Sequence, residues 1–234
     1  MPDPLDLSGR VALVTGGARG VGRGITECLL DAGAEVVICG RSTPDDLPTS
    51  SGAGAGGAGV RTAVFAQGDV RDPEQVSAII AKVIGAYGRL DILVNNAGIM
   101  DNFMPLENVT DKLWEKVMAV NVNGPFYASR LAITQMLLQG KGLIINIASI
   151  GGISGARAGL AYTTSKHALI GMSKNIGFMY AKKGIRCNVI APGGVNTNIM
   201  RDAQPDPEGA ALCSSGAGSM PRMGESDEIA KVAL

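Results

Sequence analysis

The chain has 234 residues, of which 46% are hydrophobic and 18% charged, and this balance excludes disorder over most of its length. Its 21 basic and 21 acidic residues cancel, so we expect no binding to nucleic acid and none to a membrane. The four cysteines lack metal-ligand spacing, and no apolar run is long enough to cross a bilayer, which predicts a cytoplasmic protein without a metal site.

Short apolar runs alternate with helical patterns along the chain. The runs predict strands at residues 11–14, 36–39, 62–65, 90–94, 143–147 and 187–190. Helices are expected at residues 24–32, 111–120, 127–138 and 162–181, and another one from about residue 225. Apolar strands separated by helices are typical of a parallel sheet covered on both faces. We therefore predict one α/β domain, residues 1–234, with a doubly wound parallel sheet.

Two stretches interrupt this alternation. Residues 42–59 are rich in glycine, proline and serine where a crossover helix is expected, and they predict a flexible surface loop. Residues 202–220 are similarly rich in small residues and proline. Composition leaves two interpretations of the second stretch open, a mobile lid and a disordered linker.

A glycine-rich loop, T-G-G-A-R-G-V-G at residues 15–22, follows the first predicted strand and opens a helix. Gly16, Gly20 and Gly22 would permit the tight turn, the approach of a pyrophosphate to the helix N-terminus, and close packing of the helix on the sheet. The alternative is a tight turn that binds no ligand.

Tyr162 and Lys166 are four residues apart, so on a helix their side chains share a face. An adjacent ammonium can lower the pKa of a phenol, and we expect Lys166 to do this to Tyr162. Ser149 follows the predicted strand at 143–147, where its hydroxyl could stabilise negative charge on a substrate oxygen. Taken alone, Tyr162 and Lys166 would more simply belong to an exposed helix face, and Ser149 would be a helix cap.

Six motifs in order carry a resemblance to a known family. They are T-G-G-A-R-G-V-G, G-D-V at 68–70, N-N-A-G at 95–98, N-V-N-G at 121–124, Ser149 with Tyr162 and Lys166, and P-G-G-V-N-T at 192–197. The set resembles the short-chain dehydrogenase/reductase family from about residue 9 to residue 234. The resemblance implies a Rossmann-type domain, a nicotinamide dinucleotide cofactor, and hydride transfer between a carbonyl and an alcohol.

The resemblance also implies roles for individual residues. Tyr162 would be the acid and base, Ser149 would bind the substrate oxygen, Lys166 would hold the nicotinamide ribose, and Asn121 would hold a water that relays protons. Asp69 would accept a hydrogen bond from the adenine amino group. The expected cofactor-binding residues are Gly16, Arg19, Gly20, Val21, Gly22, Arg41, Asp69, Val70, Asn95, Ala97, Gly98, Tyr162, Lys166, Pro192, Gly193, Val195 and Thr197.

The end of the second predicted strand bears on the choice of cofactor. It reads Cys39-Gly40-Arg41, without the carboxylate that usually holds the ribose diol of NAD, and Arg19 lies in the glycine loop. Two guanidinium groups suit a 2′-phosphate, which favours NADP(H) over NAD(H).

The sequence thus predicts an NADP(H)-dependent oxidoreductase that interconverts a carbonyl and a secondary alcohol, similar to 3-oxoacyl-thioester reductases, with residues 196–220 choosing a small-molecule substrate. The alternatives are an NAD(P)-dependent sugar, polyol or secondary-alcohol dehydrogenase and a non-catalytic dinucleotide-binding protein. In the family the helices at 127–138 and 162–181 pair between subunits, which implies a homotetramer. The family also continues beyond residue 234 with one more strand, so we expect the sheet to lack its final strand.

Overall fold

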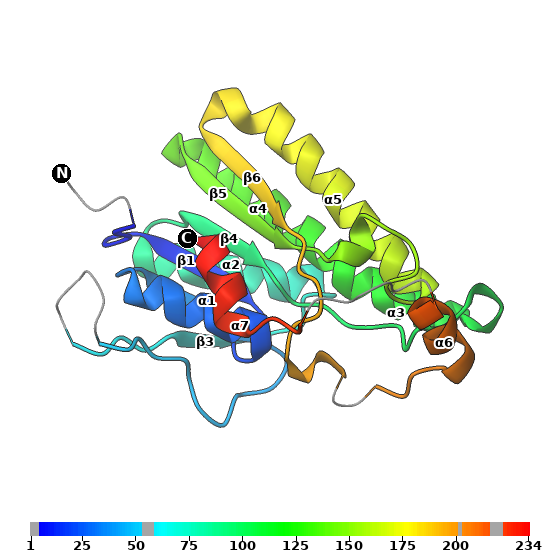
Figure 1. The fold of residues 1–234 in the computed structure, drawn as a ribbon. Helices are drawn as coiled ribbons and strands as arrows, with labels where there is room; N and C mark the ends of the chain where they lie inside the picture. The colour runs from blue at the N-terminus through cyan, green and yellow to red at the C-terminus, as the bar shows by residue number, and fades with distance from the viewer. Residues whose placement is uncertain (1–4, 53–58, 201–202, 216–221) are drawn as a thin grey trace.

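The computed structural model describes residues 5–52, 59–200, 203–215 and 222–234. Its strands form one parallel sheet of six strands in the order β3-β2-β1-β4-β5-β6 (Figure 1). The strands are β1 (Val11–Thr15), β2 (Glu35–Gly40), β3 (Val64–Gln67), β4 (Ile92–Asn95), β5 (Gly142–Ile147) and β6 (Ile185–Ile190). The predicted strands are confirmed, with ends displaced by up to two residues.

Helices cover both faces of this sheet. They are α1 (Gly20–Asp31), α2 (Pro73–Tyr87), α3 (Asp111–Met118), α4 (Gly124–Gln139), α5 (Leu160–Tyr180), α6 (Pro207–Ser215) and α7 (Ser226–Ala233). Successive strand residues point to opposite faces, so Leu13 of β1 packs in the core with α2 and α4, while Val14 packs with α1 and α7. The doubly wound Rossmann-type architecture is therefore confirmed.

The chain between α3 and α4 departs from the expected pair of separate helices. A π-helical turn, Ala119–Asn123, joins α3 directly to α4, and Asn121 lies within it. A π turn widens the helix by one residue and is common at functional sites. Helical periodicity alone does not reveal such a turn.

The stretch at residues 202–220 contains a helix that its composition did not predict. In its described part, α6 begins at Pro207, whose fixed φ suits a first helical residue. Asp206 accepts a hydrogen bond from the Gly209 amide at 2.8 Å and so caps the helix. In residues 42–52 and at residue 59, by contrast, no helix forms, and the flexibility of residues 42–59 stays a prediction.

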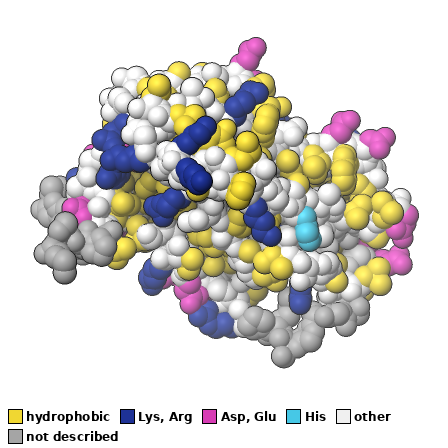
Figure 2. All heavy atoms as spheres, turned by 90° about the horizontal axis from the view of Figure 1, so that it is seen from above, with side chains coloured by type: hydrophobic (Ala, Val, Ile, Leu, Met, Phe, Trp, Pro, Cys, Tyr) yellow, Lys and Arg dark blue, Asp and Glu magenta, His cyan; other side chains and the backbone are white. Residues whose placement is uncertain are grey.

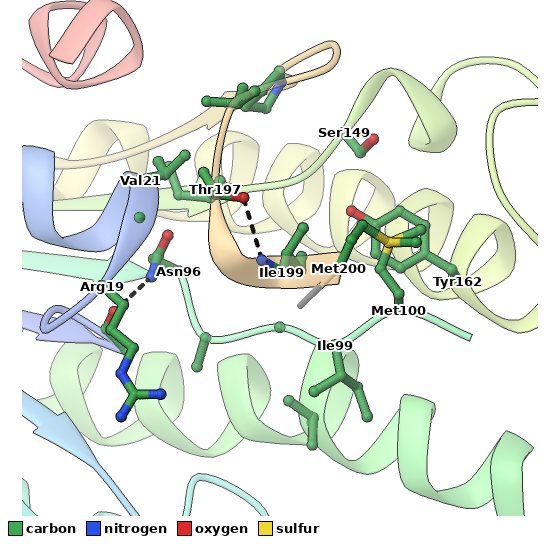
Figure 3. Close-up of a pocket in the computed structure, with 18 of the residues that line it drawn as sticks. Arg19, Val21, Asn96, Ile99, Met100, Ser149, Tyr162, Thr197, Ile199 and Met200 are labelled. Atoms are coloured by element: carbon green, nitrogen blue, oxygen red, sulfur yellow. Dashed lines mark hydrogen bonds between the residues drawn. The ribbon is translucent and has the colours of Figure 1, made fainter. Parts of the chain in front are cut away.

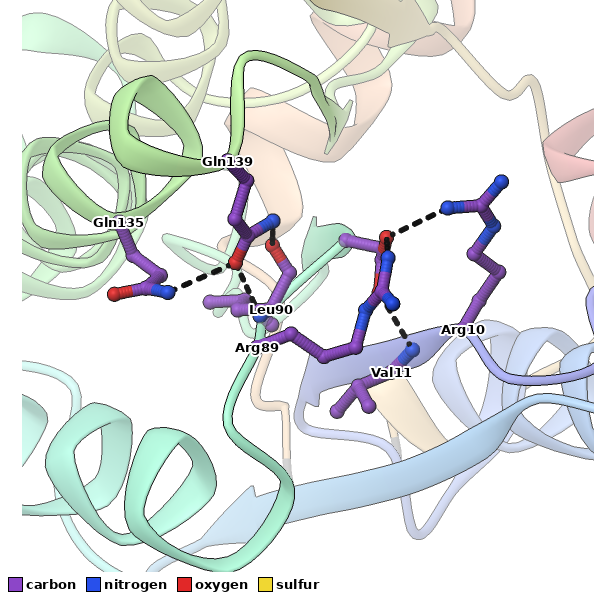
Figure 4. Close-up of polar contacts among 7 residues, drawn as sticks. Arg10, Val11, Arg89, Leu90, Gln135 and Gln139 are labelled. Atoms are coloured by element: carbon purple, nitrogen blue, oxygen red, sulfur yellow. Dashed lines mark hydrogen bonds and ion pairs between the residues drawn. The ribbon is translucent and has the colours of Figure 1, made fainter.

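A buried carboxylate, Asp91, lies just before β4 at the amino ends of the strands, and its partners Arg10, Val11 and Arg89 are shown in Figure 4. It accepts the Val11 amide at 3.0 Å and pairs with Arg89 and Arg10. Burial raises the pKa of Asp91, but the hydrogen bonds from Arg89 and Val11 outweigh burial and hold the pKa below its usual value. Asp91 therefore links β1 to the start of β4 at the amino ends of the strands, whereas the glycine loop lies at their carboxyl ends.

Candidate active site

A pocket of about 920 Å³ lies at the carboxyl ends of the parallel strands. Figure 3 shows Arg19 on one side of it and Ser149 and Tyr162 on the other. The predicted site residues that line it are Gly16, Arg19, Gly20, Val21, Arg41, Asp69, Val70, Ala97, Gly98, Ser149, Tyr162, Lys166, Pro192, Gly193, Val195 and Thr197. Gly22, Asn95 and Asn121 do not line the pocket.

The glycine loop is held against the loop that follows β4. Asn96 donates its side-chain amide to the carbonyl groups of Thr15 at 2.9 Å and Gly16 at 3.2 Å. The Thr15 hydroxyl accepts the amides of Asn96 and Ala97 at 3.0 and 3.1 Å. Thr15 and Asn96 lie inside the quoted motifs but are not among the predicted site residues.

Gly22 has a packing role in this arrangement. A Cβ atom at Gly22 would lie 2.3 Å from the Gly16 carbonyl oxygen and 2.4 Å from the Asn96 amide nitrogen. Gly16 itself has a φ of 65°, which favours glycine. These glycines let the chain turn sharply into α1 while the glycine loop stays packed against the loop after β4.

The N-terminus of α1 faces the pocket. Its N-cap residue, Arg19, makes no side-chain hydrogen bond to the helix, and Gly20 and Val21 of the first turn line the pocket. The unpaired amides and the dipole at a helix N-terminus attract anions. These residues fit the pyrophosphate of a dinucleotide.

Basic side chains line the part of the pocket formed by the loops after β1, β2 and β3. Arg19, Arg41 and Arg71 all line it. Arg71 donates to Asp69 at 2.9 and 2.5 Å, and this hydrogen bonding lowers the pKa of Asp69. Arg19 and Arg41 form no ion pair within the part of the chain that the structure describes. The role of Asp69 toward adenine stays a prediction.

The structure places Asn95 beneath the pocket rather than in its wall. Its side-chain amide donates to Ser129 at 3.0 Å and to Asn146 at 2.8 Å, so it links β4 to α4 and β5. The wall itself is formed by the next three residues, 96–98. Asn95 is the last residue of β4, and its side chain points to the face of the sheet that α4 covers.

Ser149, Tyr162 and Lys166 lie together at one end of the pocket. Tyr162 and Lys166 lie on one face of α5 and are only 7% and 4% exposed. The Lys166 Nζ atom lies 5.5 Å from the centre of the Tyr162 ring and donates to the Ile147 carbonyl at 2.8 Å. The Ser149 hydroxyl accepts the Gly151 amide at 3.0 Å.

The electrostatics of this group differ from the expectation for Tyr162. Burial raises the pKa of Tyr162, a hydrogen bond with Ser149 opposes this rise, and the charge of Asp101 adds to it. Burial also lowers the pKa of Lys166 to about 8. The expected lowering of the Tyr162 pKa by Lys166 is therefore wrong for this structure, because burial penalises the charged forms of both groups.

Asn121 lies behind Lys166, in the π-helical turn. Its side-chain amide donates to the Ile99 carbonyl and to the Ser165 hydroxyl, both at 3.0 Å, and its oxygen accepts the Ile99 amide at 2.9 Å. Ser165 in turn donates to the Tyr162 carbonyl at 2.7 Å. Through these bonds the Asn121 side chain fixes the segment after β4 against α5, and its water-holding role stays a prediction.

The loop after β6 closes the pocket over the glycine loop. A Cβ atom at Gly20 would lie 3.2 Å from the Thr197 side chain, so these loops touch. Figure 3 shows the segment from Thr197 to Met200 crossing between Val21 and Tyr162. From the predicted substrate loop, 196–220, the residues that line the pocket are Thr197, Ile199, Met200, Cys213 and Ser214. Residues 201–202 and 216–220 lie outside the described residues.

The comparisons with known proteins agree with this geometry. A family model described as short chain dehydrogenase matches residues 10–208. The chain belongs to the short chain dehydrogenase family. As a member of an oxidoreductase family, it has the fold that holds a nicotinamide dinucleotide. In its described residues no helix combines the length and the apolar character needed to cross a membrane.

Other short chain dehydrogenases resemble this chain over most of its length. It is 38% identical over 231 residues to 3beta-hydroxysteroid dehydrogenase 2 of Eggerthella lenta, covering 97% of this chain and 87% of that protein. The structure of Thermoplasma acidophilum aldohexose dehydrogenase gives a TM-score of 0.79 at 31% identity, with 97% and 86% of the two chains covered. That of levodione reductase gives 0.80 at 31% identity, with 96% and 89% covered.

We predict that Gly22→Ala disrupts the glycine loop of this short chain dehydrogenase. The added methyl group would meet the Gly16 carbonyl, so we expect a loss of about 1–3 kcal/mol in unfolding free energy and weakened dinucleotide binding. Urea unfolding and cofactor titration measure both. Gly85→Ala in α2 is the matched control, since nothing lies within 4 Å of its added Cβ. Equal behaviour of the two variants would contradict this interpretation.

Proposed function

We propose that this short chain dehydrogenase is an NADP(H)-dependent oxidoreductase that interconverts a carbonyl and a secondary alcohol. The observation that carries the proposal is the convergence of Ser149, Tyr162 and Lys166 on a pocket that continues to the N-terminus of α1. A non-catalytic dinucleotide-binding protein would not require these three side chains at one end of the pocket.

The side chains have complementary tasks in this proposal. Bound nicotinamide would supply or accept the hydride at the substrate carbon. In reduction Tyr162 gives its phenol proton to the carbonyl oxygen, and in oxidation the phenolate takes the alcohol proton. The Ser149 hydroxyl binds the same oxygen, and the Lys166 ammonium stabilises the phenolate. The raised pKa of Tyr162 keeps the phenol protonated near neutral pH, as a proton donor in reduction requires.

Replacement of Tyr162 by Phe tests this assignment. The variant keeps the ring but loses the transferable proton, so we expect turnover to fall by about 10²–10⁴-fold. Binding of NADPH, followed by fluorescence titration, should persist because the pyrophosphate and arginine contacts remain. Unchanged turnover in Tyr162→Phe would contradict the assignment, and absence of turnover in the folded wild type on every substrate of a carbonyl panel would favour the non-catalytic alternative.

The preference for NADP(H) rests on two arginines that form no ion pair with a described carboxylate. Arg19 and Arg41 line the pocket from the loops after β1 and β2, and no carboxylate stands at the end of β2. The nearby Asp46 pairs with Arg23 at 2.7 Å. A guanidinium pair of this kind suits a 2′-phosphate better than a ribose diol.

Arg41→Ala should weaken NADPH binding by about tenfold or more, which corresponds to about 1.4 kcal/mol for a lost charged contact. The Kd for NADH should change little, and it serves as the internal control in the same titration. Equal affinities for NADPH and NADH in the wild type, unaffected by the substitution, would contradict the preference.

The side chains at the substrate end of the pocket favour an apolar carbonyl compound as substrate. Figure 3 shows Met100 and Met200 beside Tyr162. Phe103, Ile150 and Ile199 add apolar side chains to the lining, which also includes Arg157. Such a surface suits the hydrophobic body of a steroid, a cyclic ketone or an acyl chain better than a sugar. A substrate panel for the turnover assay should therefore contain a ketosteroid, a cyclic diketone, a 3-oxoacyl thioester and an aldohexose.

Exposed apolar side chains on α4 and α5 support assembly of the chain into a homotetramer. Leu138 of α4 is 82% exposed and Phe178 of α5 is 87% exposed. Figure 2 shows hydrophobic side chains at the surface among lysines and arginines. Exposed apolar patches of this kind mark interaction sites. Light scattering should give about four times the 24.0 kDa chain mass, and a monomeric mass would contradict this part of the proposal.

A further inference from the structure

One buried carboxylate in the active-site region has no role in the chemistry described above. Asp101 lies in the segment after β4 that brings Met100 and Phe103 to the pocket. Its exposed fraction is 0%, and it forms no ion pair with any described residue. A charge in such a position is costly unless its hydrogen bonds compensate for the lost water.

Both carboxylate oxygens of Asp101 accept hydrogen bonds from backbone amides. Its Oδ2 atom accepts the amide of Tyr162 at 2.8 Å, and its Oδ1 atom accepts that of Phe103 at 3.2 Å. The first bond joins residues that are 61 positions apart in the sequence. Asp101 therefore connects the backbone of the catalytic tyrosine to the wall of the substrate pocket.

The bond to Tyr162 replaces a missing helix cap. Tyr162 is the third residue of α5, and the N-cap residue, Gly159, has no side chain to accept its amide. A Cβ atom at Gly159 would lie 2.6 Å from both Asp101 oxygens, so the close approach requires glycine. The Leu160 amide also bonds to the segment, through the Met104 carbonyl at 3.1 Å.

The same segment holds the helix of the substrate loop. Asn102 and Phe103 both have a φ of 59°, a left-handed conformation that residues other than glycine adopt only with support from their surroundings. The Asn102 carbonyl accepts the Asp206 amide at 2.8 Å, directly before α6. The Phe103 carbonyl also packs closely on Gly209 of α6.

We propose that Asp101 is a positioning residue, which caps α5 at Tyr162 and joins that helix to the α6 segment of the substrate pocket. This inference rests on the proposed function, because it assigns Asp101 an effect on the acid and base of that reaction. Substitution of Asp101 should therefore alter the setting of Tyr162 as well as the stability of the fold.

The charge of Asp101 gives this role a measurable signature. Burial raises the pKa of Tyr162 first, and the charge of Asp101 raises it further. Lys166 on α5 lies 5.5 Å from the centre of the Tyr162 ring, and Ser149 after β5 forms a hydrogen bond with the phenol. Cys213, whose pKa burial and Asp101 also raise, lines the same pocket. Removal of the Asp101 charge should lower the pKa of Tyr162, since this negative charge repels the phenolate.

The experiment is a spectroscopic titration of Tyr162 in the Asp101→Asn protein. The amide keeps the side-chain shape and one acceptor oxygen but removes the charge. Because the chain has four tyrosines, the Tyr162 signal is the difference between each protein and its Tyr162→Phe counterpart. We expect the midpoint to fall by about half a pH unit, or about threefold in the tyrosinate fraction at a pH below the midpoint. The pH dependence of alcohol oxidation should shift in the same direction.

Asp91→Asn is the matched control, because Asp91 is also a buried carboxylate that accepts a backbone amide, at the amino ends of the strands. It should lose stability without moving the Tyr162 midpoint. If Asp101→Asn does not fold, Asp101→Ser, which also lacks the charge and keeps an acceptor, carries the same titration.

A midpoint that stays at the wild-type value, or that moves equally in Asp91→Asn, would overturn the inference. The titration needs no substrate, so it separates this inference from the proposed function. If the wild type lacked turnover while the midpoint still fell in Asp101→Asn, the proposed reaction would fail and the positioning contact would stand.

Discussion

The parallel direction of all six strands is the constraint on which the site depends. Because every strand points the same way, the loops after β1, β2, β4, β5 and β6 meet at the carboxyl ends of the strands. Each of these loops lines the pocket. The bonds from Asn96 to the carbonyl groups of Thr15 and Gly16 then hold the glycine loop among these loops. At the amino ends of the strands Asp91 fixes β1 against the start of β4, so the register that places these loops is held from both ends.

Tyr162 and Lys166 are buried to a degree that their spacing in the sequence does not reveal. Tyr162 and Lys166 share a helix face, as their spacing requires, but both are almost fully buried. Burial raises the pKa of the phenol and lowers that of the ammonium to about 8, so each group is shifted toward its neutral form. In the proposed function the neutral phenol of Tyr162 would be the proton donor, and the protonated form of Lys166 would stabilise the phenolate once it forms. Ser149 and Asp101 then act on the phenol in opposite directions.

Much of this could be predicted from the sequence because the signals are local. Apolar runs mark buried parallel strands, and the glycine loop, Ser149, Tyr162 and Lys166 lie in short motifs next to them. The rest depends on contacts between distant residues. Asp101 reaches Tyr162 across 61 positions, and the pKa direction of Tyr162 follows from burial that no spacing reveals. Helix α6 was missed because its small residues obscured the Asp206 and Pro207 start signal, and the π-helical turn at Asn121 leaves no mark in the periodicity.

Isotope transfer tests the central claim most directly, that these residues support hydride transfer to a carbonyl. NADPH carrying deuterium at the reactive face of nicotinamide C4 would be incubated with the wild-type protein and an apolar ketone, and the alcohol analysed by mass spectrometry and NMR. We expect one deuterium on the carbinol carbon of each product molecule, and none on oxygen after exchange with water. Product without deuterium from either C4 face, or no product from a folded protein that binds NADPH, would contradict it.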